Sequence, residues 1–112
     1  MYSRRSLIMT LAALSIGALS PCGAEDAVTI ELSIQNRQFH PAEIVAPANR
    51  PIIIKIKNLD KAAAEFESVS LRVEKVIPAG GEGIVRLRAL QAGRYQFFDD
   101  FNPEAKGVLI VQ

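Results

Sequence analysis

Apolar and polar residues alternate where the larger part of the chain begins, and this alternation limits the fold more than any other feature. Val28, Ile30, Leu32 and Ile34 are each separated from the next by one polar residue. A period of two is typical of a β-strand with one face buried and the other in solvent. No helical period follows this segment, and further strand-like segments lie at residues 52–56, 65–71, 73–77, 84–90, 95–99 and 108–111.

Turn-forming residues separate these segments. Proline, glycine and asparagine gather at residues 47–49, 58–60, 78–81 and 91–93, and such clusters are typical of connections between strands. About seven or eight short strands at this spacing predict an all-β sandwich.

The N-terminal segment has the pattern of a secretory signal peptide. Two arginines precede an apolar run at residues 7–19, and a proline and small residues follow it. The run is shorter than the roughly 20 residues of a membrane-spanning helix. We therefore expect residues 1–24 to be removed near Ala24, which leaves one domain at residues 25–112 in the periplasm.

Two details of this segment leave its processing open. Arg4 and Arg5 resemble the pair of a twin-arginine signal, which is an alternative to general secretion. Cys22 follows a stretch that resembles a lipobox, although Pro21 departs from that pattern. A lipid on Cys22 would anchor the protein to the membrane, and we expect the free form instead.

Composition excludes several kinds of site. The chain has 13 basic and 12 acidic residues, so no basic face is implied and nucleic acid is not an expected partner. Its one cysteine and both methionines lie in the signal segment, and His40 is the single histidine. Sites built on thiolates, such as iron–sulfur and zinc–cysteine sites, are therefore excluded for the mature chain. No catalytic motif is present, and we do not expect an enzyme.

The end of the chain resembles the closing hairpin of a cupredoxin. In GRYQFFDDFNPEAKGVLIVQ the frame residues Gly93, Tyr95, Phe97 and Gly107 match that family, and a final apolar strand follows. The resemblance implies a cupredoxin-like Greek-key β-sandwich. Tyr95 also follows a glycine as in a tyrosine corner, whose hydroxyl bonds a backbone group upstream, so we expect its role to be structural.

The copper ligands of that family are missing. By the resemblance, Ala64 stands at the first histidine position, and Asp99, Asn102 and Ala105 stand at those of the cysteine, second histidine and methionine. A blue-copper centre requires two imidazoles and a thiolate. Electron transfer through such a centre is therefore excluded.

One branch of the family is more similar than the rest. The segments Glu65-Phe66-Glu67-Ser68 and Glu74-Lys75-Val76 resemble the cupredoxin-like domain found with periplasmic iron-uptake components and near high-affinity iron permeases. This resemblance implies a membrane iron or metal permease, or another periplasmic uptake component, as partner. Related sequences often have histidine where this chain has Asn102, so any site that used that imidazole is in doubt.

Carboxylates are the remaining ligand type, and they favour hard cations such as iron, with divalent copper as a weaker choice. Alternation places Glu65 and Glu67 on one face of a strand, and Asp99 at the polar end of the core. The resemblance implies that Glu74 lies on an adjoining strand, and that Asp100 and Glu104 lie in the loop that surrounds the metal in copper-binding members. The candidate metal ligands are Glu65, Glu67, Glu74, Asp99, Asp100 and Glu104.

Two interpretations follow. The first is an exported metal-handling protein that binds an iron or copper ion through these carboxylates for a membrane uptake system. The second is a metal-free interaction module that docks on a permease or oxidase. In it the acids form a docking face or pair with bases such as Arg72, Lys75 and Arg94, and Phe98 and Phe101 contribute an apolar patch. His40 is expected to be a hydrogen-bonded edge residue, not a ligand.

Overall fold

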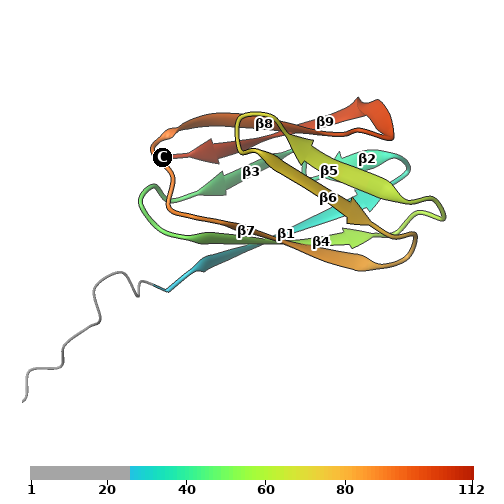
Figure 1. Cartoon of the computed structure of the whole chain (residues 1–112), viewed down its shortest axis with the longest axis horizontal. Helices are drawn as coiled ribbons and strands as arrows, with labels where there is room; N and C mark the ends of the chain where they lie inside the picture. Colours follow the sequence, from blue (N-terminus) through green and yellow to red (C-terminus); the bar gives the residue numbers. More distant parts are fainter. Residues whose placement is uncertain (1–25) are drawn as a thin grey trace, which may run out of the picture.

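The computed structural model describes residues 26–112, which form a sandwich of two sheets and nine strands (Figure 1). The predicted signal peptide and Cys22 lie outside the described residues. The four-stranded sheet has the order β2 (Gln38–His40), β1 (Val28–Gln35), β4 (Ile52–Asn58) and β7 (Glu82–Leu87). The five-stranded sheet has the order β3 (Glu43–Ala46), β9 (Asn102–Val111), β8 (Gly93–Asp99), β5 (Ala64–Ser68) and β6 (Val73–Ile77).

The predicted alternation forms the core. Leu32 and Ile34 of β1 and Ile54 and Ile56 of β4 are buried, and the residues between them face outward or are half-buried. β1 and β4 run parallel and in register, so their buried residues form adjacent rows on one sheet face. The expectation of an all-β sandwich is confirmed.

Three aromatic rings connect the two sheets near the site described below. Phe66 and Phe97 are stacked with their centroids 4.8 Å apart. Phe39 meets Phe97 edge-on at 5.0 Å. Gly107 lies opposite Phe97, and a Cβ at this glycine would come 2.4 Å from the ring. The aromatic packing therefore requires glycine here, and it holds the β8–β9 hairpin against the core.

Several predicted strand limits were wrong. The segment 65–71 ends as a strand at Ser68, because residues 69–72 form a turn in which the Arg72 N–H donates to the Val69 carbonyl at 3.2 Å. Arg72 has a φ of 57°, which is outside the extended region. β7 covers 82–87 instead of 84–90, and the short β2 and β3 raise the strand number to nine.

The tyrosine corner is confirmed. The Tyr95 hydroxyl donates to the carbonyl of Gln91 at 2.8 Å. This bond connects the start of β8 to the loop that enters it, so Tyr95 is structural as expected. Among residues 26–112, no helix is long and apolar enough to cross a membrane.

Candidate metal centre

Two glutamates project from the outer face of the five-stranded sheet. On β5 the residues Ala64, Phe66 and Ser68 are buried, and Glu65 and Glu67 between them are half-buried on the other side. The predicted placement of both glutamates on one strand face is therefore confirmed. This face is the solvent side of the sandwich, opposite the side on which Ala64 and Phe66 are buried.

Asp100 completes a group of three carboxylates. It directly follows β8, and its backbone N–H donates to the Glu65 carbonyl at 3.0 Å. One ligand atom from each of Glu65, Glu67 and Asp100 lies within 4.8 Å of the others. The backbone bond thus fixes the turn after β8 against β5 and brings its carboxylate to the two glutamates.

Glu74 lies beside this group on the edge strand. It is the direct partner of Glu67 in the antiparallel pairing of β5 with β6. This register confirms that Glu74 comes from the adjoining strand. Side chains of directly opposite residues interact, and like charges there are destabilising.

The proximity of the acids changes their protonation. A hydrogen bond to Glu74, partial burial and the charges of Asp100, Glu74 and Glu65 raise the pKa of Glu67 from 4.5 to about 7. Burial first, and then the hydrogen bond and charge of Asp100, raise the pKa of Glu65. Every group that shifts these two glutamates is another acid, so a cation at this point would relieve the repulsion.

One base lies near the group. Arg72 lines a shallow hollow at the β5–β6 turn together with Glu67 and Glu74. It is exposed and belongs to the turn, whereas Lys75 follows Glu74 on β6 and is paired with the core residue Phe66. Of the bases expected to match the acids, Arg72 is thus the one that shares their hollow.

Asp99 is not brought into the carboxylate group. It lies opposite the core residue Phe66 in the β5–β8 pairing and is 4% exposed, so the prediction that it sits at the polar end of the core is confirmed. Its Oδ1 accepts the backbone N–H groups of Glu65 and Phe101, both at 2.9 Å. The expectation of a shared cluster is corrected here, because Asp99 faces inward while Glu65 and Glu67 face outward.

Glu104 is also separate from the three carboxylates that meet within residues 26–112. Phe98 is paired with Lys106 and Asp99 with Asn102, so residues 103–105 have no partner on β8. In this bulge Ala105 is buried and Glu104 is exposed to solvent. The irregular register, which the sequence pattern does not reveal, turns Glu104 outward.

The positions of the former copper ligands do not fit a blue-copper centre. Ala64 and Ala105 are buried apolar residues, and Asp99 accepts two backbone N–H groups as described. Asn102 donates through Nδ2 to the Arg37 carbonyl at 3.1 Å. These side chains fill the end of the sandwich with packing and hydrogen bonds, and they provide neither the imidazoles nor the thiolate that such a centre requires.

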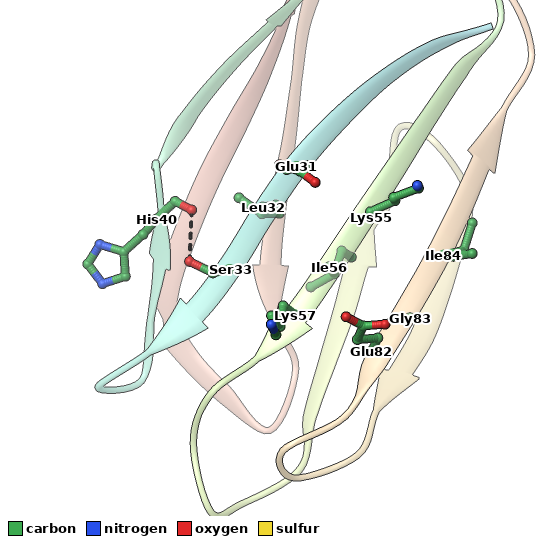
Figure 2. Close-up of a pocket in the computed structure, with 10 residues that line it drawn as sticks. All are labelled: Glu31, Leu32, Ser33, His40, Lys55, Ile56, Lys57, Glu82, Gly83 and Ile84. Atoms are coloured by element: carbon green, nitrogen blue, oxygen red, sulfur yellow. Dashed lines mark hydrogen bonds between the residues drawn. The ribbon is translucent and has the colours of Figure 1, made fainter.

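His40 lies on β2, in the other sheet, and is exposed (Figure 2). The Ser33 hydroxyl donates to the His40 carbonyl at 3.2 Å, and the Nε2 atom lies 3.2 Å from the Gln35 carbonyl. His40 is thus a hydrogen-bonded edge residue, as expected.

Figure 2 shows a hollow on the outer face of the four-stranded sheet that the sequence analysis did not single out. Its charged residues are paired across strands, Glu31 with Lys55 and Glu82 with Lys57. The period-two pattern already places the two lysines on one strand face, but only the register puts acids opposite them. Since opposite charges alternate here, this hollow has little net charge.

The two-sheet fold and the inactive copper position define a cupredoxin-like domain without a blue-copper centre. The model of the cupredoxin-like domain family matches residues 6–111. The chain belongs to this family. It is also 30% identical over 88 residues to the uncharacterized protein RP394 of Rickettsia prowazekii, an alignment that covers 78% of this chain and 70% of that protein.

Solved structures show the same fold at low sequence identity. The metal-binding domain of the Cu(I)-exporting P-type ATPase CopA of Streptococcus pneumoniae has a TM-score of 0.68 and 18% identity, with 78% of this chain and 96% of that chain covered. Auracyanin A, a blue copper protein of Chloroflexus aurantiacus, has a TM-score of 0.65 and 15% identity, with 78% and 100% covered. These likenesses show the architecture.

Proposed function

We propose that this protein is an exported, cupredoxin-like metal-handling protein that binds iron, or less favourably copper, through carboxylates. The observation that carries the proposal is the convergence of Glu65, Glu67 and Asp100, whose oxygen atoms lie within 4.8 Å of one another on an accessible face. Glu74 supplies a fourth carboxylate next to Glu67. We assign the protein no catalytic step and no blue-copper electron transfer.

The chemistry of the donors favours a hard cation. Carboxylate oxygens suit iron, manganese, calcium or magnesium, and divalent copper accepts them with less selectivity. A hydrogen bond to Glu74, burial and the charges of neighbouring acids raise the pKa of Glu67 to about 7, so this carboxylate retains a proton at a point where a cation could replace it. A bound cation would neutralise the group, whereas an ordinary surface of paired charges has nothing to gain from one.

The biological setting of this proposal comes from resemblance. A structural neighbour is described as the metal-binding domain of a Cu(I) exporter, which supports metal handling for this fold in general. Monovalent copper prefers sulfur ligands, and the described residues contain no cysteine or methionine. Together with the similarity to the iron-uptake branch, this favours iron and a periplasmic role beside a membrane permease or another uptake component.

Calorimetric titration with ferric, ferrous and cupric ions tests the metal site. We expect one ion per chain and at least about tenfold weaker binding in Glu67→Gln, because the negative charge and one of the two carboxylate oxygens are lost. Glu82→Gln, on the outer face of the other sheet, is the matched control and should bind like the wild type. Absence of binding heat with all three ions would contradict the proposal.

The alternative is a metal-free interaction module for the same membrane system. It is favoured by the exposed aromatic side chain of Phe101, which is 52% accessible next to Asp100, and by Arg72 beside Glu67 and Glu74. In this case the acids would pair with a partner's bases. Titrations without heat, together with a direct interaction between purified protein and permease that Phe101→Ser weakens, would support it.

Export and lipidation are tested by the mass of the protein isolated from membranes and from the periplasm. We expect a soluble chain that begins near residue 25. A diacylglyceryl adduct on Cys22 would instead establish a membrane-anchored form.

A further inference from the structure

One row of residues crosses the outer face of the five-stranded sheet and has opposite charges at its two ends. Glu74 of β6 is paired with Glu67 of β5, Glu67 with Phe98 of β8, and Phe98 with Lys106 of β9. Glu67 and Phe98 point outward, because both neighbours of each on its strand are buried. Lys106 lines the same surface hollow as Phe98. The row therefore reads acid, acid, aromatic, base.

An aromatic side chain occupies the middle of this face. Phe98 is half-buried on β8, the central strand of the five, and lines a hollow of about 760 Å³ together with Pro103 and Val108. Farther along the face Val45 is 54% exposed. A large apolar side chain in the centre, with charges toward the rim, is the usual composition of a protein interface.

We propose that this face is a homodimer interface on which a second copy of the chain packs, sheet against sheet, about a two-fold axis along β8. Such an axis places each row over the same row of the partner subunit in reversed order. The β5 side of one sheet therefore lies over the β9 side of the other. Phe98 then meets Phe98 of the partner subunit, and Glu67 meets Lys106 of the partner subunit. The symmetry produces this Glu67–Lys106 contact twice, as in any isologous interface.

The charges of this one row favour a second copy as the occupant and select the axis. A two-fold axis in the same plane but perpendicular to the strands would place β5 and β6 of one subunit over β5 and β6 of the other. The acids of these strands would then face one another. Like charges in such positions oppose association. The axis along β8 is the one that places the acid Glu67 of this row over the base Lys106. Both axes keep the strands aligned, as sheets that pack face to face require.

The outer face of the four-stranded sheet does not have acids on one side and a base on the other. On the four-stranded sheet Glu31 is paired with Lys55 and Glu82 with Lys57 (Figure 2). Arg86 also points outward and is paired with Ile53, so this face has a base opposite each of these acids and no acidic side. On the proposed interface the remaining charged groups divide less regularly than those of the row. Glu65 and Asp100 lie on the β5 side and Glu43 on β3, while Arg94 lies on β8 and Arg72 at the β5–β6 turn.

This inference goes beyond the proposed metal site, and the two make opposite demands on Glu67. A cation and Lys106 of the partner subunit would compete for the same carboxylate, so the dimer should weaken when the metal binds. The test is therefore made in excess chelator, where its result does not depend on whether the protein binds metal.

Sedimentation equilibrium of the purified protein, processed as the expressing cell leaves it, gives the test. One sheet face is at the small end of stable interfaces, which bury about 800 Å² per partner, so we expect a dimer at high micromolar concentration. K106E and E67K should each weaken the dimer more than about tenfold, because each places like charges opposite one another twice. Circular dichroism verifies that both variants fold.

Mixing the two variants is the decisive measurement. K106E chains combined with E67K chains have opposite charges at both contacts, so the mixture should dimerise although neither variant does alone. K57E, the same change on the other sheet, should leave the dimer intact. A wild-type monomer at all concentrations, a dimer that survives K106E, or a mixture that stays monomeric would each overturn the proposal.

Discussion

The two faces of the five-stranded sheet use carboxylates in opposite ways. On the inner face Asp99 is 4% exposed, and its Oδ1 accepts two backbone N–H groups. On the outer face Glu67 has acids around it, and its pKa is raised to about 7. These carboxylates belong to neighbouring strands, and the face of the sheet decides what each can do.

This difference separates Asp99, at the position that the resemblance assigns to the copper cysteine, from the candidate metal site. The carboxylate at the former cysteine position holds the backbone of the β8–β9 turn and the start of β5 in place. The acids without such partners lie one layer farther out, where an ion or another chain can reach them. Asp99 is thus a structural group inside the sandwich, while ion binding by Glu65, Glu67 and Asp100 would occur outside.

Removing the inner carboxylate should have the largest effect. Asp99→Ala leaves the N–H groups of Glu65 and Phe101 without their acceptor, and we expect a loss of about 3 kcal/mol in the free energy of unfolding. Asp99→Asn retains an oxygen acceptor and should lose about 1 kcal/mol. Urea denaturation measures both. Equal stability of Asp99→Ala and wild type would mean that the inner face is not held by this side chain.

The second prediction compares the two faces in metal affinity. Glu67→Gln should weaken binding at least about tenfold, whereas Asp99→Asn should change it less than about threefold, because Asp99 supplies no oxygen to the group and asparagine keeps the acceptor for the Glu65 N–H. Calorimetric titration under identical buffer conditions measures both affinities. A larger loss in Asp99→Asn would return the metal site to the inner face.

The third prediction is that the stability contributed by Glu67 falls as the pH rises, whereas an acid with a lowered pKa would give the opposite dependence. Glu67 has a folded pKa of about 7 against an ordinary value of 4.5, so the folded state binds more protons than the unfolded state between these values. Glu67 therefore contributes to the free energy of unfolding at low pH, and this contribution is lost as the pH rises from 4.5 through about 7. Glu65, whose pKa is also raised, acts in the same direction.

Urea midpoints between about pH 5 and about pH 8 test this sign. Glu67→Gln removes the titrating group, so its midpoint should change less over this range than that of the wild type. Glu82→Gln serves as the control and should retain the wild-type slope. A wild-type midpoint that rises with pH, and rises equally in Glu67→Gln, would contradict the raised pKa.

The smallest effect is expected at Glu104. It is exposed on the bulge of β9, away from the three carboxylates that meet. Glu104→Gln should change both the metal affinity and the free energy of unfolding by no more than about 0.5 kcal/mol. A clear loss of metal affinity in this variant would show that the bulge moves toward the site when an ion binds.

Local patterns were enough to predict most of the sheet. The alternation at Val28, Ile30, Leu32 and Ile34 gives a strand, and Tyr95 after Gly93 gives the corner that the hydroxyl bond confirms. The end of β5 was predicted wrongly, because the turn that closes it depends on a positive φ at Arg72, where no glycine or proline signals it. Turn chemistry of this kind is invisible to hydrophobic periodicity.

The candidate site was only partly predictable for a related reason. Period two places Glu65 and Glu67 together, but the pairing of β8 with β5 decides which acid of Asp99 and Asp100 joins them. The bulge between Phe98 and Asp99 then separates Glu104 from the group. Register and bulges arise from contacts between strands, so no single segment contains them.

By itself the sequence determined that residues 26–112 form an all-β sandwich without sulfur ligands, because periodicity and composition are properties of the chain alone. Tertiary structure decided which carboxylates meet and which one, Asp99, accepts hydrogen bonds from the backbone instead. It also brought Glu67, Phe98 and Lys106 into one row across three strands. The physical reason is that side-chain direction follows from the strand, whereas side-chain neighbours follow from how strands pair.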